Sequence, residues 1–389
     1  MKNPVSVTET ETSRWLVPLS DVRVDAELRE AVGETLGSGW WSMGPRVADF
    51  ERAFAEFLGI PHALAVANGT AALHLALLGI GCGPGDEVVV PSLNFVAAAN
   101  AIAHTGASPV FCDIVGDRDL TLDPDDLAAA VGPRTKAVVV LHYGGFACDM
   151  GAVRAIAAER SIEVVEDAAH APGATYEGES CGALGRISCF SFFSNKNLPV
   201  GEGGMIATAD EELAERVRLL RSHGMTTLTW DRHRGHAGSY DVVAQGFNYR
   251  LDEIRAAMGI VQLGRLRDEN RARERVVARY RAALDGVDGL TMPFAARDSA
   301  ASSHHLAVFL LPVGTNRDEV RAAMAEKRIQ TSVHYPPIHL FTQYREAGAQ
   351  RRLPRTEEVA DRLVTLPLYA HMDESQADLV IEALRESLR

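Results

Sequence analysis

Hydrophobic and polar positions in the first two thirds of the chain follow two alternating patterns. Short apolar runs, typical of buried strands, are followed by longer stretches with helical spacing. The apolar runs lie at 62–66, 87–91, 109–113, 136–142, 162–167, 187–193 and 204–208, and the helical stretches between the first five lie near 70–79, 95–104, 124–131 and 149–160. This alternation favours right-handed crossovers. It therefore predicts an α/β fold with a mostly parallel seven-stranded sheet that is covered on both faces.

A helix is expected before the first strand, because Val47, Phe50 and Phe54 share one helical face and Gly59 follows as a stop signal. The stretch 167–187 is rich in Gly, Glu and Ser, and 193–204 leaves no room for a helix. The last strands are therefore expected to break the simple alternation, with one of them antiparallel.

The pattern changes after about residue 265. An Arg-rich helical stretch, 265–281, carries interleaved acids and is expected to be a solvated helix face. A strand at 305–311, a helix at 316–327, a strand at 329–334, a long irregular connection at 335–354 and a final helix after Asp373 are expected beyond it. The chain is thus divided into a large α/β domain, 15–265, and a smaller α+β domain, 266–389.

Composition narrows the class of protein. The chain has 389 residues, which is enough for a large core, and its net charge of -13 disfavours nonspecific nucleic-acid binding. No apolar run is long enough to cross a membrane, and the polar stretch 1–14 has no signal-peptide pattern. The five cysteines are scattered without a CxxC pair, which favours reduced thiols in the cytoplasm and no metal site.

Lys196 is one of four lysines in a chain with 35 arginines. It follows the apolar run Cys189–Phe193 and precedes the glycine-rich turn 201–204. A desolvated lysine in such a place can form an imine with a carbonyl compound, which arginine cannot. A solvated or salt-bridged lysine at a strand end is the alternative.

Two further polar groups follow the predicted strand 162–167. Asp167 and His170 are expected at its carboxyl end, where parallel sheets bind ligands. The alternatives are that Asp167 caps a turn and that His170 is a hydrogen-bonded core histidine.

Asn68, Gly69 and Thr70 follow the first strand and open an apolar helix. Free N–H groups at a helix N-terminus favour an anion, although simple capping explains the same residues. Ser191 is expected to add a hydroxyl. Together with Lys196, Asp167 and His170, these residues supply the amine, carboxylate, imidazole and phosphate site that pyridoxal 5′-phosphate (PLP) requires.

At this point the chain resembles a known family, the DegT/DnrJ/EryC1/StrS sugar aminotransferases of PLP fold type I. The resemblance extends over nearly the whole chain. It rests on the ordered motifs Pro18-Leu-Ser-Asp, Ser38-Gly-Trp-Trp-Ser-Met-Gly-Pro45, Asn68-Gly-Thr-Ala-Ala72, Pro84-Gly-Asp-Glu87, Glu166-Asp-Ala-Ala-His170, Ser191-Phe-Phe-Ser-Asn-Lys-Asn197, Gly246-Phe-Asn-Tyr-Arg250 and Leu366-Pro-Leu-Tyr369.

The resemblance implies a role for each matching catalytic residue. Lys196 matches the lysine that forms the imine with PLP and moves the substrate proton. Asp167 matches the acid at the pyridine nitrogen, and His170 matches a position at the ring oxygen. Some family members carry histidine at the lysine position and act as dehydratases, so Lys196 favours transamination.

The resemblance also implies the remaining cofactor contacts. Gly69, Thr70 and Ser191 match phosphate ligands, and Phe95 matches an aromatic residue that stacks on the pyridine face. Asn248 matches a residue that reaches the phosphate in the neighbouring subunit, which implies a homodimer with shared active sites.

The reaction implied is transfer of an amino group from L-glutamate to a nucleotide-linked keto-deoxy sugar, with pyridoxamine phosphate (PMP) as the intermediate cofactor form. His170 favours amination at C4 of a dTDP-4-keto-6-deoxy sugar, because C3 enzymes often carry Gln there. The Ala, Arg and Gly content is typical of high-GC bacteria and favours a secondary-metabolite (antibiotic) pathway. A C3 keto sugar or a keto-cyclitol is the alternative substrate.

Four more residues are candidates for substrate contacts. His334 and Tyr335 are expected at the sugar pocket, with core packing of His334 as the alternative. His223 and Arg250 are candidates for the nucleotide phosphates, with a surface or dimer-contact role as the alternative. Two other classes of protein fit less well. A regulatory homologue without activity would not need an intact Lys196. An NAD-binding α/β protein would require a GxGxxG motif after the first strand, which this sequence lacks.

Overall fold

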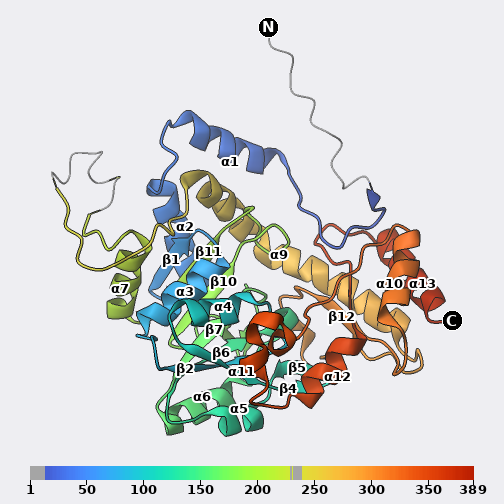
Figure 1. Cartoon of the computed structure of the whole chain (residues 1–389). Coiled ribbons are helices and arrows are strands. Elements are labelled where there is room, and N and C mark those ends of the chain that lie inside the picture. Colours follow the sequence, from blue (N-terminus) through green and yellow to red (C-terminus); the bar gives the residue numbers. More distant parts are fainter. Residues whose placement is uncertain (1–13, 228–229, 231–238) are drawn as a thin grey trace.

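The computed structural model of the chain describes residues 14–227, 230 and 239–389 (Figure 1). The stretch 1–14, in which no signal peptide was expected, lies outside this range apart from Arg14. Within the described residues, no helix has both the length and the apolar character needed to cross a membrane.

A seven-stranded sheet forms the centre of the N-terminal part of the chain, with strand order β1-β11-β10-β7-β6-β2-β3. Its strands are β1 (His62–Val66), β2 (Glu87–Pro91), β3 (Ser108–Cys112), β6 (Thr135–Leu141), β7 (Glu163–Asp167), β10 (Ile187–Ser191) and β11 (Gly204–Thr208). All seven predicted strands are present. β11 is antiparallel to both of its neighbours, as expected for one of the last strands, and the other pairings are parallel.

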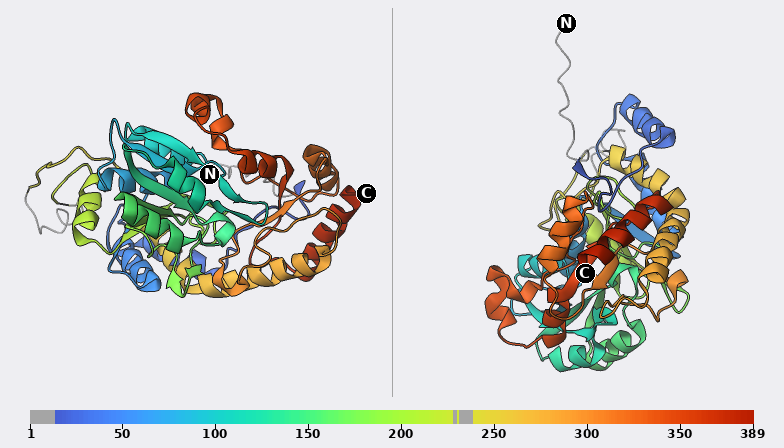
Figure 2. Two further views of the ribbon diagram at one scale, coloured as in Figure 1. Left: turned by 90° about the horizontal axis from the view of Figure 1, so that it is seen from below. Right: turned by 90° about the vertical axis from the view of Figure 1, so that its right-hand side faces the viewer.

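Helices cover both faces of this sheet (Figures 1 and 2). The four predicted between the first strands are α3 (Gly69–Gly79), α4 (Ala97–His104), α5 (Pro124–Ala130) and α6 (Met150–Arg160). The predicted helix before β1 is α2 (Pro45–Leu58), and Gly59 ends it in the left-handed conformation at φ 78°. The fold is therefore that of an α/β protein with a doubly covered sheet.

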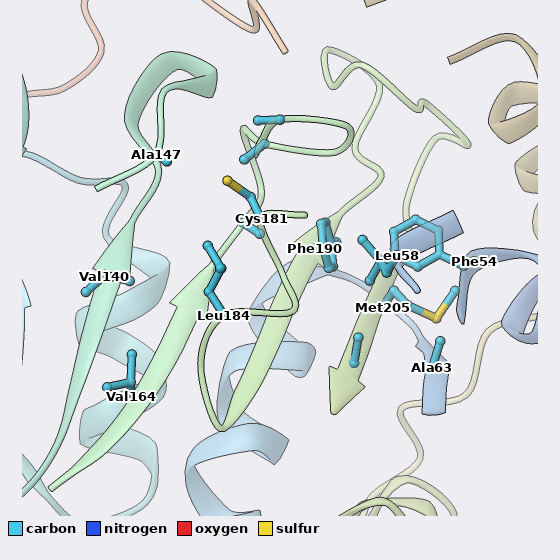
Figure 3. Close-up of a cluster of buried hydrophobic side chains, with 14 of the residues drawn as sticks. Phe54, Leu58, Ala63, Val140, Ala147, Val164, Cys181, Leu184, Phe190 and Met205 are labelled. Atoms are coloured by element: carbon cyan, nitrogen blue, oxygen red, sulfur yellow. The ribbon is translucent and has the colours of Figure 1, made fainter. Parts of the chain in front are cut away.

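Successive side chains of each strand point to opposite faces of the sheet, so the core has two layers. Val138 and Val140 of β6 pack into one cluster with α2 and α6, whereas Val139 packs into the other with α3 and α4. Figure 3 shows part of the first cluster, where Phe54 of α2 meets Phe190 of β10 with ring centroids 4.9 Å apart. This packing holds the carboxyl ends of the strands in a fixed arrangement.

The C-terminal part has a third hydrophobic cluster of its own. It contains the antiparallel pair β12 (Ala307–Leu310) and β13 (Leu363–Leu366), with α10 (Arg317–Glu326) and α13 (Glu374–Ser387). The predicted strand 305–311 and helix 316–327 are thus confirmed with shorter bounds, and the final helix begins directly after Asp373 as predicted. The strand β13 was missed.

Two predictions for this part are wrong. The stretch 329–334 is not a strand, because its backbone forms isolated bridges with two different segments: Gln330 N–H donates to Val17 O, and Ser332 forms a bridge with Thr365. The connection 335–354 is not irregular throughout, since it contains η4 (Ile338–Leu340), η5 (Thr342–Tyr344) and α11 (Arg345–Gly348).

The helix α9 (Glu253–Leu284) runs between the two parts (Figure 1). Its first half contributes Ala256 and Leu266 to the core around the sheet, and its second half contributes Val276 and Tyr280 to the C-terminal core. The proposed division at 265/266 therefore falls inside one continuous helix. Its Arg-rich stretch is not solvated throughout, because Arg273 is buried.

The other elements lie around this frame. They are α1 (Ala26–Gly37), β4 (Ile114–Gly116), β5 (Asp119–Leu122), η2 (Tyr143–Gly145), β8 (Thr175–Tyr176), β9 (Glu179–Ser180), α7 (Glu211–Arg221), η3 (Ser299–Ala301) and α12 (Pro354–Arg362).

Candidate active site

Three strand ends meet at one edge of the central sheet. Val66 at the end of β1 and Ser191 at the end of β10 both pair with Gly204, the first residue of β11. Asp167 at the end of β7 pairs with Cys189 of β10. The residues that follow these strands therefore converge, as expected for polar groups at the carboxyl ends of parallel strands.

A cavity of about 570 Å³ opens at this edge, a size in the range of small-molecule sites. Nine of the predicted site residues line it: Gly69, Thr70, Phe95, Asp167, His170, Ser191, Lys196, His334 and Tyr335. Three do not line it: His223, Asn248 and Arg250.

Lys196 is part-buried in the cavity wall, in the turn after β10. Burial lowers the pKa of its amine to about 8, and the negative charge of Asp167 opposes this shift. A substantial fraction of the amine is then neutral near physiological pH, as imine formation requires. The solvated strand-end alternative does not fit this position.

Asp167 is buried, and its Oδ1 accepts the N–H of Ala169 at 3.2 Å. Burial raises the pKa of the carboxyl, while this backbone hydrogen bond and the charge of Lys196 lower it. The turn-capping alternative is thus also true, but it uses one oxygen and leaves the carboxylate in the cavity wall.

His170 is held in one orientation by two contacts. Its Nδ1 accepts the N–H of Gly144 at 3.3 Å, so the neutral ring carries its proton on Nε2, which lies 2.8 Å from the hydroxyl of Tyr335. Burial, followed by the positive charge of Lys196, lowers the pKa of His170 well below its ordinary value. The ring is therefore a neutral hydrogen-bond donor at the cavity.

The anion site predicted at the start of α3 has the geometry that such a site needs. Asn68 caps the helix by accepting the N–H of Ala71 at 2.8 Å. The helix N-terminus faces Ser191 so closely that a Cβ on Gly69 would lie 2.8 Å from the Cβ of Ser191. Glycine is required for this close approach, which brings the hydroxyl and the helix N-terminus to one point.

Phe95, His334 and Tyr335 form another part of the wall. The rings of Phe95 and Tyr335 lie 5.9 Å apart, and Phe95 remains 56% exposed in the single chain. His334 is buried, and its Nδ1 lies 3.0 Å from the hydroxyl of Thr365. Burial and the charge of Lys196 lower the pKa of His334 to about 4. It therefore packs in the core and also reaches the cavity as a neutral ring.

His305 is a neighbour of Lys196 that the sequence did not reveal. Its Nε2 lies 3.4 Å from Lys196 Nζ, and its Nδ1 lies 2.9 Å from Asn197 Oδ1. The amide of Asn197 is oriented by two hydrogen bonds from its Nδ2, to Asn270 Oδ1 and to the carbonyl of Ser303. His305 Nδ1 must therefore donate, which leaves the lone pair of Nε2 facing the amine. The polar run Ser302-Ser303-His304-His305 before a strand was the available signal.

Comparison with known proteins identifies the family. The DegT/DnrJ/EryC1/StrS aminotransferase family matches residues 22–385. The spore coat polysaccharide biosynthesis protein SpsC of Bacillus subtilis is 42% identical over 380 residues, covering 96% of this chain and 97% of SpsC. The chain belongs to the DegT/DnrJ/EryC1/StrS aminotransferase family.

Solved structures of similar proteins agree with this assignment. The aminotransferase TlmJ from Streptoalloteichus hindustanus has a TM-score of 0.89 at 37% identity, with 96% of this chain and 99% of TlmJ covered. DesV of S. venezuelae, solved with a ketimine intermediate, has a TM-score of 0.86 at 37% identity over the same shares. Like its relatives, the chain is a PLP-dependent sugar aminotransferase.

The residues of the cavity fit the cofactor of this family. PLP needs an amine, an anion site, an acid for its ring nitrogen and a polar group at its ring oxygen. Lys196, the α3 N-terminus with Ser191, Asp167 and His170 provide these groups within one cavity. The lack of a side chain on Gly69 lets Ser191 lie against the start of α3, where the phosphate site is predicted.

Proposed function

We propose that this sugar aminotransferase moves the amino group of L-glutamate to a nucleotide-linked keto-deoxy sugar, at C4 of a dTDP-4-keto-6-deoxy sugar. The observation that carries the transfer chemistry is the part-buried amine of Lys196, with a pKa of about 8, in one cavity with the carboxylate of Asp167. The choice of C4 rests on His170, which occupies the position where C3 enzymes of the family often carry Gln.

We propose the following roles for the residues of this chain. Bound PLP supplies an electron-accepting ring. Lys196, as a neutral amine, would take the proton from the α-carbon of the donor and move it during the transfer. Asp167 would keep the ring nitrogen protonated, and His170 would contact the side of the ring that carries the oxygen. His305 accepts a hydrogen bond from Lys196 and orients its lone pair.

His334 and Tyr335 are proposed as sugar contacts, because they line the same cavity as Lys196. Both present polar atoms that carry no charge near neutral pH, since burial lowers the pKa of His334 and raises that of Tyr335. Neutral donors and acceptors suit the hydroxyl and keto groups of a sugar.

We propose a homodimer with shared active sites, in which the three predicted site residues outside the cavity act across the dimer interface. Asn248 and His223 are exposed, and Arg250 is half-buried with an unpartnered Nη1 among the described residues. Exposed apolar side chains include Phe95 and Phe193 at the cavity, and Val242 and Val243 a few residues before Asn248 in the sequence. Apolar surface of this kind favours a protein interface. In such a dimer, Asn248 would reach the partner's phosphate site, and His223 and Arg250 the nucleotide phosphates.

The substrate alternatives remain a C3 keto sugar and a keto-cyclitol, which would use the same cofactor residues. The product is proposed to be an amino sugar for a bacterial secondary metabolite, and the similarity to SpsC extends this to a surface polysaccharide. A cytoplasmic location is proposed because all five cysteines are free and buried, as in proteins that keep reduced thiols.

The proposed function is tested by following the visible absorbance of the purified holoenzyme. L-Glutamate should bleach the absorbance of the lysine-bound cofactor, and dTDP-4-keto-6-deoxyglucose should restore it. Bleaching without recovery would contradict the C4 substrate and point to a 3-keto sugar or a keto-cyclitol. No response to L-glutamate would contradict the donor.

A further inference from the structure

Asn94 is a polar residue of the cavity wall that has no role among those proposed above. It follows β2 and directly precedes Phe95. Its side chain lines the cavity, although only 1% of the residue is exposed. A buried amide without hydrogen bonds is costly, so both the oxygen and the nitrogen of this side chain need partners.

The oxygen of the Asn94 amide has a partner. Its Oδ1 accepts the backbone N–H of Phe95 at 2.6 Å. The flipped orientation would place the amide NH2 group against this N–H, so the hydrogen bond determines which end is oxygen and which is nitrogen. Nδ2 is therefore the end that remains free to donate elsewhere.

The nitrogen of the Asn94 amide lies near Asp167. Nδ2 is buried and meets no acceptor in good hydrogen-bond geometry among the described residues. Burial raises the pKa of the Asp167 carboxyl, and hydrogen bonding by the side chain of Asn94 is one of the effects that lower it. The two side chains are thus close together, and a small movement of either one would satisfy the donor and the carboxylate at once.

The other groups that stabilise the charge of Asp167 leave this position open. The backbone N–H of Ala169 donates to Oδ1 of the carboxylate at 3.2 Å. Lys196 lowers the pKa of Asp167 by its charge, while its Nζ faces His305. Asn94 is a neutral donor, so it can stabilise the carboxylate without adding charge to the cavity.

Three further titratable groups face the same carboxyl. His142 uses both of its ring nitrogens elsewhere, on Glu166 at 2.8 Å and on the N–H of Cys148 at 3.2 Å. Burial raises the pKa of the Tyr335 hydroxyl and of the Cys189 thiol, so neither carries a charge near neutral pH. These groups therefore do not replace the Nδ2 donor.

We propose that Asn94 is a positioning residue whose Nδ2 donates to the carboxylate of Asp167 and holds it ionised towards the ring of bound PLP. The proposal rests on the role proposed above for Asp167 at the ring nitrogen. Because Oδ1 of the same amide holds the backbone of Phe95, one side chain would fix both the acid and the aromatic residue proposed for the ring face. Without Nδ2, less would oppose the effect of burial, and the carboxyl would take up its proton at a higher pH.

The first measurement follows the titration of Asp167 in the cofactor-free protein. NMR of protein labelled with ¹³C at the aspartate side-chain carboxyls gives its midpoint, and Asp167→Asn identifies the signal. Asn94→Leu keeps about the same volume and removes the donor. The midpoint of Asp167 should rise by about 1 to 2 pH units, the change expected on loss of a hydrogen bond to a charged group.

Two more variants separate this hydrogen bond from folding. Asn100 of α4 accepts a hydrogen bond from the hydroxyl of Tyr344 and is not among the residues that line the cavity, so Asn100→Leu should leave the Asp167 midpoint unchanged. Asn94→Asp keeps the side-chain shape and an oxygen for Phe95, but it places a second carboxyl beside Asp167. The midpoint should then rise further, and this variant keeps the test decisive if Asn94→Leu does not fold.

A second measurement connects Asn94 to the cofactor. In the holoenzyme prepared with PLP that carries ¹⁵N in its ring, the chemical shift of this nitrogen reports whether it is protonated. A carboxyl with a higher pKa competes more strongly for that proton. The ring nitrogen of Asn94→Leu should therefore lose its proton at a lower pH than that of the wild type.

The outcomes distinguish the contact from the function on which it rests. An unchanged Asp167 midpoint in both Asn94 variants would overturn the proposal. A rise in Asn94→Asp with no change in folded Asn94→Leu would also overturn it, because the two side chains would be close without a hydrogen bond. A rise in both variants that leaves the ring nitrogen unaffected would support the contact and contradict the role proposed for Asp167 at that nitrogen.

Discussion

The lone pair of His305 Nε2 faces the Nζ of Lys196 at 3.4 Å. Burial and the charge of Lys196 lower the pKa of His305 well below its ordinary value, so the ring stays neutral and can only accept at Nε2. This contact spans the two parts of the chain, because His305 precedes β12 of the C-terminal part. The orientation of the reacting amine therefore depends on how the two parts pack.

Replacing His305 should slow proton transfer without loss of substrate binding. His305→Ala removes the acceptor that orients the amine, and kcat should fall by about 10- to 100-fold while KM changes little. His305→Gln, which can place an oxygen near Nε2, should recover part of the loss. Steady-state kinetics with L-glutamate measures both quantities.

His304 is the matched control, since it is equally buried but its Nε2 lies 2.9 Å from the carbonyl of Ser299. His304→Gln should affect stability and leave kcat near the wild-type value. Equal losses of kcat in both variants would show that His305 acts through folding alone.

The pH dependence of the rate of PLP binding to the cofactor-free protein should report the pKa of the Lys196 amine. In the cofactor-free protein, only the neutral amine reacts with added PLP, so the rate should rise with pH and level off above about pH 8. An ordinary lysine would continue to gain reactivity towards 10.5. Stopped-flow absorbance gives the midpoint, and Lys196→Ala should abolish the signal.

Removing the charge of Asp167 should shift the pH midpoint of PLP capture in a known direction. It raises the pKa of Lys196, so its removal in Asp167→Asn should move the midpoint of PLP capture to lower pH. The same variant should lower transamination strongly, because the ring nitrogen would lose the acid partner proposed for it. A midpoint that moves to higher pH would contradict the electrostatic coupling between these two residues.

Cofactor binding at the predicted phosphate site should be sensitive to a single methyl group at Gly69. A Cβ there would lie 2.8 Å from the Cβ of Ser191, and an overpacked contact costs about 1–3 kcal/mol. Gly69→Ala should therefore weaken PLP by about 10-fold or more, measured by titrating the cofactor-free protein. Gly33 has no atom within 4 Å of an added Cβ, and Gly33→Ala should leave the affinity unchanged.

Sequence pattern predicted the central sheet well because its signals are local. The seven strands and their helices follow from apolar runs and helical spacing, and the meeting of Asp167, Ser191 and Lys196 follows from parallel strand ends. The stretch 329–334 looked like a strand but has partners at Val17 and Thr365, which no local pattern reveals.

The neighbours of Lys196 that come from distant segments were missed for a related reason. His305 reaches the amine across 109 positions of sequence, through the packing of α9 and β12. Arg273 looked like part of a solvated helix face, since its helix is rich in charges. It is buried because the segments 20–23 and 368–371 close over α9, and tertiary packing of this kind overrides helical pattern.

The proposed sharing of active sites between subunits makes a prediction that separates it from a site within one subunit. Asn248 is exposed and lies outside the cavity of its own chain, so Asn248→Ala should weaken PLP only through the partner's site. Mixing inactive Lys196→Ala protomers with Asn248→Ala protomers should then create heterodimers in which one site has both residues intact. In a two-fold dimer with random pairing, activity at limiting PLP should return to roughly a quarter of the wild-type value. If Asn248 served its own chain, no mixed dimer would contain an intact site, and mixing would restore nothing.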